Sequence, residues 1–338
     1  MATVDTETDV DTKDIKELSS LIQSLRDQVS NVIIGQEDVV DQVLMLLLSG
    51  GHGLLVGVPG LAKTLLVRTI AECTHLSFRR IQFTPDLMPS DITGTEVIQQ
   101  NQDTGEREFR FQKGPIFSQV ILADEINRTP PKTQAALLEA MEEEHVTVGN
   151  ETYELPKPFL VLATQNPLEQ EGTYPLPEAQ LDRFMFKIQV DYPEYDQELD
   201  IIMRESGQQD HEVEPVVDAD RLIEARKLVR TVVASEHVSR YALRLSRATR
   251  PDSDHSTNTV QENVEWGAGP RAGLHLLLAG RAHAVIHGEP HVSIEDVKAV
   301  APPVLRHRIL LNFMAEADGL STDDVIQNLL MEVPEPGS

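Results

Sequence analysis

The stretch Gly57-Val58-Pro59-Gly60-Leu61-Ala62-Lys63-Thr64 decides the fold of this 338-residue sequence. It follows a short apolar run, Gly53–Gly57, that is typical of a buried strand, and it precedes a helical pattern that begins at Leu65. Glycines in such a loop let backbone N–H groups surround a phosphate chain, and the N-terminus of the following helix favours an anion. We therefore predict a phosphate-binding loop over residues 57–65, with a glycine-rich turn of no binding function as the alternative.

Two side chains of this loop suit a nucleotide and its metal ion. The Lys63 ammonium would reach the β- and γ-phosphates, and the Thr64 hydroxyl would bind Mg²⁺. The general pattern has glycine where this sequence has Ala62, at the point where the helix opens. Alanine is sterically acceptable there, so we interpret the departure as tolerated.

A second signal is the apolar run Gln119–Asp124, which ends in the acidic pair Asp124-Glu125. Asp124 at the carboxyl end of a strand would hold a hydrated Mg²⁺, and Glu125 would orient and deprotonate a water molecule. A solvated strand end is the alternative interpretation of this pair.

Three further polar residues are candidates for the same site. Asn166 follows another apolar run and would hold a water molecule between Glu125 and a γ-phosphate. Arg183 would stabilise charge on a transferring phosphoryl group from across a subunit boundary, or would instead form a salt bridge with Asp182 or Glu178. Arg271 lies at a predicted helix start, where the helix dipole disfavours a cation, so it is expected to face an anion.

The order of apolar runs predicts the fold class. Short runs separated by helical segments indicate an α/β domain with a five-stranded, mostly parallel sheet between helices. The strands are expected at residues 53–57, 78–83, 119–124, 159–164 and 184–190. Hairpins are expected at 95–111, with a turn at residues 103–105, and at 145–155, with a turn at Gly149-Asn150. The later sequence indicates helices at residues 197–206, 220–233, 238–249, 271–287 and 294–306, with a loop at 251–269. The predicted divisions are a disordered acidic leader (1–14), the α/β core (15–190), an all-α domain (191–331) and a disordered tail (332–338).

The charge balance narrows the choice of partners. The sequence has 29 Lys and Arg against 55 Asp and Glu, which gives a net charge of −26. Nucleic-acid binding depends on an excess of basic residues, so a nucleic-acid partner is disfavoured. High intracellular salt is one explanation for the acidic surface, because carboxylates keep a protein hydrated; a basic partner is the other. With one cysteine, no apolar leader and no long apolar run, a cytoplasmic protein without a membrane span is expected.

The motifs together resemble those of an AAA+ ATPase, and specifically of the MoxR family, in which alanine commonly stands at the position of Ala62. The resemblance extends from about Ile15 to Arg308. It rests on Gly57–Thr64, Asp124–Arg128, Ala163–Pro167, Leu181–Phe186 and Gly269–Gly273, and on the phrases Ile33–Gln36, Pro89–Gly94 and Gln112–Phe117.

The resemblance implies a P-loop core followed by an all-α lid domain, and it implies roles for individual residues. Lys63 and Thr64 match the Walker A motif, Asp124 and Glu125 match Walker B, and Asn166 matches sensor 1. Arg183 matches the arginine finger and Arg271 matches sensor 2, while Ile34 and Gly35 resemble the segment that lines the adenine pocket. The two hairpins match the helix-2 and pre-sensor-1 insertions of this AAA+ branch.

The resemblance also implies an assembly and partners. A MoxR-like protein would form a hexameric ring with ATP and Mg²⁺ between subunits, and would couple hydrolysis to the remodelling or maturation of a protein client. A partner with a von Willebrand factor A domain is expected.

Three other functions are compatible with parts of the pattern. A Mg-chelatase-type ATPase subunit shares the same insertions, and a nucleotide-gated scaffold would bind ATP without turnover. A helicase related to the MCM proteins is disfavoured by the charge of −26 and by the lack of a basic, aromatic strand face. The arginine-rich residues 221–250 are interpreted first as a solvated helix face, second as a ring interface or partner surface, and third as a nucleic-acid site.

Overall fold

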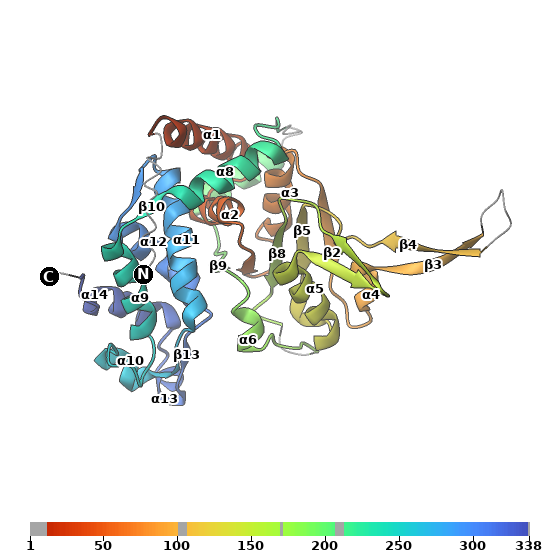
Figure 1. The fold of residues 1–338 in the computed structure, drawn as a ribbon. Helices are drawn as coiled ribbons and strands as arrows, with labels where there is room; N and C mark the ends of the chain where they lie inside the picture. Colours follow the sequence, from red (N-terminus) through yellow and green to blue (C-terminus); the bar gives the residue numbers. More distant parts are fainter. Residues whose placement is uncertain (1–11, 101–106, 170–171, 207–212, 337–338) are drawn as a thin grey trace, which may run out of the picture. The chain divides into compact units, whose positions relative to one another are not determined.

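The computed structural model describes residues 12–100, 107–169, 172–206 and 213–336. These residues form two compact units. The first, here called the sheet unit, comprises Gln28–Val40 and Gly50–Ala219. The second, here called the helical unit, comprises the described residues up to Asp27, Asp41–Ser49 and the described residues from Asp220 onward. Figure 1 labels their elements along the chain.

The sheet unit is built on five strands in the order β2-β5-β8-β1-β9, and all four pairs of neighbouring strands are parallel. The five-stranded sheet predicted from the sequence is therefore confirmed. Its strands are β1 (Gly53–Val56), β2 (Phe78–Gln82), β5 (Val120–Asp124), β8 (Leu160–Gln165) and β9 (Phe186–Gln189).

Helices cover this sheet because its central strands are apolar on both faces. Every residue of β5 from Val120 to Ala123 is buried, which a strand needs when both of its faces pack against other elements. The helical elements of the unit are α3 (Lys63–Cys73), α4 (Pro89–Thr93), the 3₁₀ turn η1 (Ile126–Arg128), α5 (Pro131–Glu143), α6 (Glu178–Leu181) and α7 (Tyr195–Glu205).

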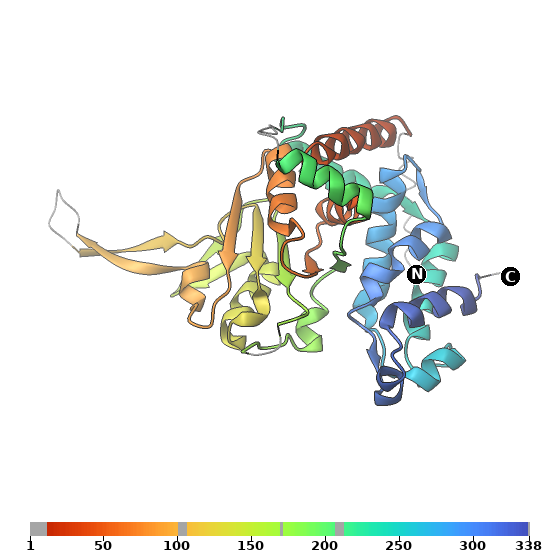
Figure 2. The ribbon, with the colours of Figure 1, turned by 180° about the vertical axis from the view of Figure 1, so that it is seen from behind.

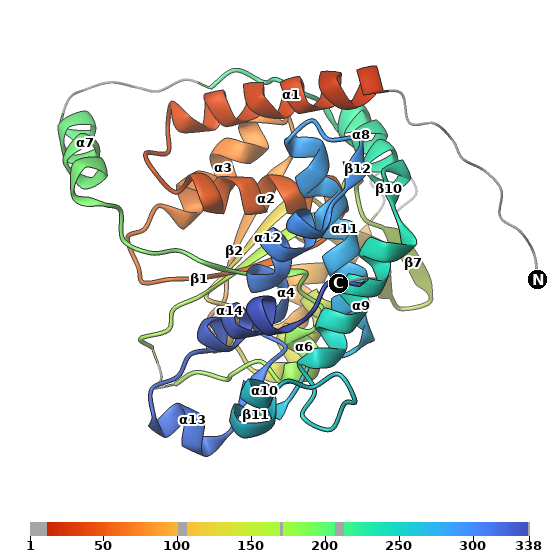
Figure 3. The ribbon, with the colours of Figure 1, turned by 90° about the vertical axis from the view of Figure 1, so that its left-hand side faces the viewer.

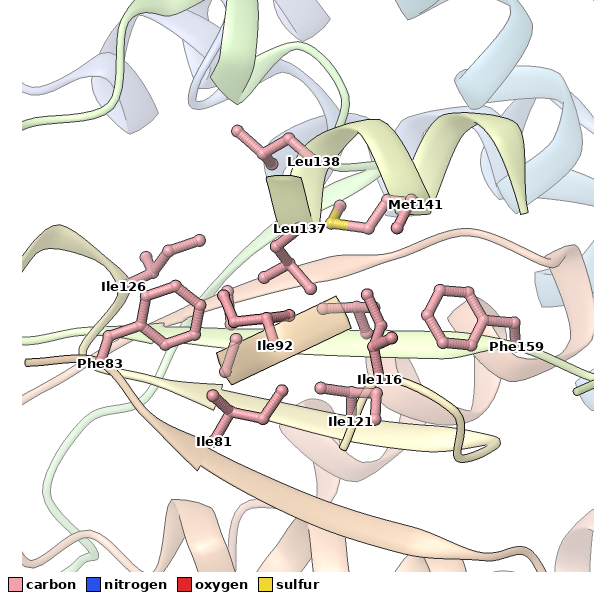
Figure 4. Packing of buried hydrophobic residues seen from close by; sticks show 14 of the residues in the cluster. Ile81, Phe83, Ile92, Ile116, Ile121, Ile126, Leu137, Leu138, Met141 and Phe159 are labelled. Carbon is pink, nitrogen blue, oxygen red and sulfur yellow. The ribbon is translucent and has the colours of Figure 1, made fainter. Parts of the chain in front are cut away.

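One face of the sheet packs against α4 and α5 (Figure 4). Leu137 and Met141 of α5 point toward the strands, where they meet Ile121 of β5 and Phe159, the residue before β8. Ile92 of α4 fills the space beside them. This apolar cluster fixes the carboxyl ends of β5 and β8, at which the candidate site lies.

Two antiparallel hairpins extend the sheet unit at the places predicted from the sequence. The longer one pairs β3 (Gly94–Gln100) with β4 (Arg107–Lys113), and Figure 2 shows it projecting from the unit. Its predicted turn at residues 103–105 lies outside the described residues. The shorter one pairs β6 (His145–Val148) with β7 (Glu151–Glu154) around the predicted Gly149-Asn150 turn. At the base of the long hairpin, the Phe111 ring stacks on the Tyr153 ring of the short hairpin at 4.3 Å.

The helical unit contains most of the remaining elements. They are α1 (Thr12–Ser30), α2 (Glu37–Ser49), α8 (Ala219–Thr231), β10 (Val233–Ala234), α9 (Glu236–Ala248), α10 (Asn258–Asn263), β11 (Val264–Trp266), α11 (Pro270–Ile286), β12 (His291–Val292), α12 (Ile294–Leu305), β13 (Leu310–Leu311), α13 (Phe313–Ala317) and α14 (Thr322–Glu332). Local capping starts several of these helices; for example, Ser293 and Asp296 form a capping box at α12.

The division into units differs from the ranges 15–190 and 191–331 that the sequence predicts. Much of α1 and α2 belongs to the helical unit, because the Arg226 guanidinium of α8 donates to the Leu47 carbonyl at 2.7 Å. The Ser19 hydroxyl of α1 likewise donates to the Ile286 carbonyl at 3.1 Å. No local sequence pattern predicts hydrogen bonds between segments so distant along the chain.

Three smaller predictions need correction. Residues 251–269 are not one loop, because they contain α10 and β11, and the Thr257 hydroxyl caps α10. Helix α1 begins at Thr12, inside the predicted leader, while residues 1–11 lie outside the described residues. Helix α14 ends at Glu332, the first residue of the predicted tail. Within the described chain, no helix is long and apolar enough to cross a membrane.

Candidate functional site

The loop that connects β1 to α3 is shaped by two residues with left-handed backbones. Gly60 has φ +89°, and a Cβ atom at this position would meet no other atom within 4 Å, so its surroundings are open. Ala62 has φ 51° and precedes the first residue of α3, and its carbonyl accepts the Leu66 N–H at 2.9 Å. The loop therefore turns directly into the helix, and the first N–H groups of α3 face its concave side.

Lys63 is the first residue of α3, and its side chain folds back over the loop. Its ammonium donates hydrogen bonds of 2.7 Å each to the carbonyl oxygens of Gly57 and Val58. Burial lowers the pKa of Lys63 below its ordinary value, although the carboxylates of Asp124 and Glu125 oppose this shift. The cation is therefore held between the loop and the acidic pair.

A cavity of about 440 Å³ opens over this loop. Its lining joins the loop to the carboxyl ends of β5 and β8, because these parallel strands end at the same edge of the sheet. The lining residues are Pro59, Gly60, Leu61, Ala62, Lys63, Thr64, Leu65, Arg80, Asp124, Glu125, Thr164, Gln165 and Asn166.

Asp124 is positioned by two neighbouring strands. The Arg80 guanidinium of β2 lies 2.6 Å from its carboxylate, and the Thr164 hydroxyl of β8 donates a short hydrogen bond to its other oxygen. The direction of the Asp124 side chain is therefore fixed.

Glu125 follows Asp124 with a left-handed backbone of φ 55°. Its N–H donates to the Thr164 hydroxyl at 2.8 Å, which links the turn to β8. Its carboxylate accepts the Gln82 amide at 2.7 Å and the Arg128 guanidinium at 2.8 Å, both on the same oxygen, Oε2. The other oxygen, Oε1, has no hydrogen-bond partner among the described residues, and Glu125 lines the cavity.

Asn166 directly follows β8 and lines the cavity. It is buried, and its Oδ1 accepts the Leu168 N–H at 3.1 Å. This bond fixes the side chain near the acidic pair.

Arg183 does not line this cavity. The sequence offered Asp182 or Glu178 as its salt-bridge partner, but the structure pairs Arg183 with Glu142 of α5, at 3.0 Å. It lies between α6 and β9, in the segment that Leu181 and Phe184 anchor to the apolar core.

The remaining predicted residues lie outside the cavity lining. Ile34 and Gly35 belong to the sheet unit, and the next residue, Gln36, donates from its amide to the Leu61 carbonyl at 3.4 Å, so this segment touches the phosphate loop. Arg271 is half-buried in the first turn of α11, in the helical unit.

Comparison with known proteins places these features in a family. Residues 52–186 match the model of the ATPase family associated with various cellular activities (AAA), and residues 257–329 match the AAA lid domain. The chain is 44% identical over 309 residues to the chaperone MoxR1 of Mycobacterium tuberculosis, covering 91% of this chain and 81% of that protein. The chain belongs to the MoxR family of AAA+ ATPases.

Two other relatives agree with this assignment. The protein YeaC of Bacillus subtilis is 40% identical over 322 residues, which covers 95% of this MoxR-family chain and 97% of YeaC. A crystal structure from Cytophaga hutchinsonii, assigned as an ATPase, is 44% identical with a TM-score of 0.88, and the match covers 95% of this chain and 97% of that chain. The α/β core and the helical lid predicted from the sequence are thus confirmed.

ATP and a divalent ion, which the family implies, fit the donor groups of the cavity. The open space at Gly60 and the N–H groups at the start of α3 suit phosphates. The Thr64 hydroxyl and the Asp124 carboxylate are oxygen ligands of the kind that Mg²⁺ takes together with phosphates and water. Among the described residues, no group of three or more His, Cys, Asp or Glu side chains is placed to hold a metal ion by itself.

Several residues of the MoxR-family site were not predicted from the sequence. Arg80, Gln82 and Arg128 contact the acidic pair, and Thr164 bridges its two members. Polar residues near the carboxyl ends of β2 and β8 were the available signal, but only the order β2-β5-β8 shows that these strands flank Asp124.

Proposed function

We propose that this MoxR-family chain binds ATP with Mg²⁺ between copies of itself in a hexameric ring. Hydrolysis then drives the remodelling or maturation of a protein complex. The proposal rests on one observation above all, which is that a single cavity brings together Lys63, Thr64, Asp124, Glu125 and Asn166.

The chemistry assigns each group a separate task. The Lys63 ammonium would leave the loop carbonyls and bind the β- and γ-phosphates, while Thr64 and Asp124 would hold Mg²⁺. The metal ion would neutralise charge on the phosphate oxygens. Glu125 Oε1 would accept a proton from a water molecule positioned by Asn166. The water oxygen would then bond to the γ-phosphorus as the bond to the β–γ bridging oxygen breaks, giving ADP and phosphate.

Arg183 supports an arrangement in which two copies share a site. Its guanidinium is fixed by Glu142 and does not line the cavity of its own chain. We propose that it acts as the arginine finger of a neighbouring copy, and that Arg271 of the lid contacts the same nucleotide. Ile34 and Gly35 would contact the adenine base.

The client and the partner are proposed from the family. The relative from Mycobacterium tuberculosis is named a chaperone, so a protein client suits this chain. A partner with a von Willebrand factor A domain would connect the ring to that client.

The central test separates ATP binding from hydrolysis. We expect Glu125→Gln to retain ATP affinity and to lose at least about 10²-fold in kcat, because general-base catalysis contributes about 10²–10⁴-fold. Lys63→Ala should instead lose ATP binding. The matched control is Glu139→Gln, a like substitution at an exposed position of α5. Normal turnover by Glu125→Gln would contradict the role of Glu125, and proteins that co-purify with this variant in ATP would identify the client.

A further inference from the structure

Helix α7 carries an apolar face that its own unit leaves exposed. Tyr195, Leu199, Ile202 and Met203 recur at helical spacing, and between 48% and 80% of each residue is exposed. Figure 3 shows α7 at the end of the segment that leads out of β9. An apolar stripe of this length on a helix marks a contact surface.

The opposite face of α7 is the one that packs on the sheet unit. The Gln197 side chain lies against Gly35, where a Cβ atom would come within 2.6 Å of its amide oxygen. The Arg204 guanidinium donates to the Asn31 carbonyl at 3.2 Å. On the helical wheel, Asp196 and Glu198 flank the apolar stripe on its two sides, so the exposed face is apolar with acidic borders.

The helical unit carries a surface of complementary character, here called the Trp266 surface. It consists of Trp266, Leu310, Phe313, Met314 and Arg247. Trp266 of β11 is paired in register with Leu310 of β13, and α13 starts at Phe313, two residues after that strand. Phe313 is 79% exposed and Trp266 is 71% exposed. Figure 1 shows β13 and α13 at one end of the helical unit.

A cavity of about 460 Å³ borders Trp266 on this surface, and two arginines line it together with Asp252 and Glu265. The Arg250 Nε donates to the Ala268 carbonyl at 2.8 Å. In contrast, the Arg247 Nε is buried and has no hydrogen-bond partner within the described residues. An unsatisfied buried donor is costly, so an acceptor brought by a partner would stabilise this surface.

From these two surfaces we infer that α7 of one copy docks on the Trp266 surface of a second copy, with an acidic residue that flanks its stripe facing Arg247. This inference rests on the proposed ring. The occupant is a second copy because the same chain carries both complementary surfaces. One is the apolar stripe of α7 with its acidic borders, and the other is the apolar Trp266 surface with the unsatisfied Arg247 Nε. Trp, Tyr, Met and Arg are the residues enriched at protein interfaces. Because the two surfaces differ, the contact is heterologous, the type of contact that forms a ring when its rotation closes.

Cysteine cross-linking tests this contact directly. The sequence has a single cysteine, Cys73, which is buried, and burial raises its pKa to about 11, so it does not compete as a thiolate. One chain carries Ile202→Cys with one tag, and a second chain carries Phe313→Cys with another tag. Both are made in the Glu125→Gln background and are mixed with ATP before oxidation. We expect a disulfide that joins the two tags.

Control variants distinguish a specific contact between chains from other causes of cross-linking. A control chain carries Glu139→Cys instead of Ile202→Cys, at an exposed position away from α7, and should give no cross-link. A chain that carries both Ile202→Cys and Phe313→Cys should give linked multimers. If this double variant cross-links only within single chains, the contact is intramolecular and the inference is overturned.

Assembly measured by sedimentation gives an independent readout. Ile202→Asp should lower the assembled fraction at least tenfold. Asp196→Arg should lower the assembled fraction by a smaller factor, and adding Arg247→Glu to this variant should restore assembly. If the wild-type chain assembles but these variants and the cross-links show no effect, the docking surfaces are wrong and the proposed ring stands. If the wild-type chain stays monomeric at saturating ATP, both the ring and this contact are overturned, while ATP binding through Lys63 is unaffected.

Discussion

The Gln82 amide donates a hydrogen bond of 2.7 Å to the Glu125 carboxylate, from the last residue of β2 to the residue that follows β5. The same carboxylate oxygen also accepts the Arg128 guanidinium at 2.8 Å. Two donors on one oxygen restrict the orientation of the carboxylate of Glu125, which lines the cavity. Gln82 is therefore a positioning residue for the proposed base.

Loss of this hydrogen bond should affect turnover more than binding. We expect Gln82→Ala to lower kcat about tenfold and to leave KM for ATP nearly unchanged, because a hydrogen bond to a charged group contributes about 1.5–3 kcal/mol. Steady-state ATPase kinetics measure this effect. Gln112→Ala, at an exposed position of β4, should change neither constant. A rise in KM with unchanged kcat would mean that Gln82 acts on substrate binding instead.

The Arg183–Glu142 ion pair leads to a prediction about subunit mixing. Arg183→Ala should lose about 10³-fold in kcat, the lower range for an arginine finger, while it still binds ATP. Mixtures of Arg183→Ala and Glu125→Gln chains should regain part of the activity, because some sites then combine an intact base with an intact arginine. Arg221→Ala, an exposed arginine of α8, serves as the control. Mixed rings without any recovered activity would contradict a finger supplied by a neighbouring chain.

The buried Asp296 gives a prediction about stability and pH. Burial alone would raise the pKa of Asp296, but hydrogen bonds from His283 and Ser293 outweigh this effect and lower the pKa below its ordinary value. A carboxyl group with a lowered folded-state pKa stabilises the fold above its unfolded-state pKa of about 3.9, and the contribution is lost as the pH falls through the folded value.

Asp296→Asn should therefore lower the free energy of unfolding by about 2–3 kcal/mol at neutral pH. The difference from wild type should stay constant down to about pH 5 and shrink below about pH 4. Urea denaturation followed across this range measures it, with the exposed Asp318→Asn as control. A difference that grows in acid would show that the charged form of Asp296 is not the stabilising one.

Gly267 lies where the chain passes close to the end of α9. A Cβ atom at this position would lie 2.2 Å from the Thr249 carbonyl oxygen, so Gly267→Ala forces the backbone to shift. We expect a loss of about 2 kcal/mol or more in the stability of the helical unit, seen as a lower Tm. At Gly269 a Cβ atom meets nothing within 4 Å, so Gly269→Ala should have a much smaller effect. Equal losses in both variants would show that space at Gly267 is not the cause.

The sequence alone determined those features whose cause is local. The glycines and Lys63 of the phosphate loop, and the acidic pair after an apolar strand, are contiguous, so their pattern predicts both the strand–loop–helix unit and its ligand. The five strands, and the helices α3, α7, α8, α9, α11 and α12, were also predicted within a few residues. Their bounds depend on runs of apolar residues and on capping residues such as Ser293.

The tertiary structure decided which residues surround those motifs. Arg80, Gln82 and Thr164 reach the acidic pair only because β2 and β8 lie on either side of β5, an order that no local pattern encodes. The pairing of Arg183 with Glu142, and the joining of α1 and α2 to the helical unit, also depend on contacts between segments far apart in sequence. Local chemistry sets what each segment can do, whereas the packing of distant segments sets which groups act together.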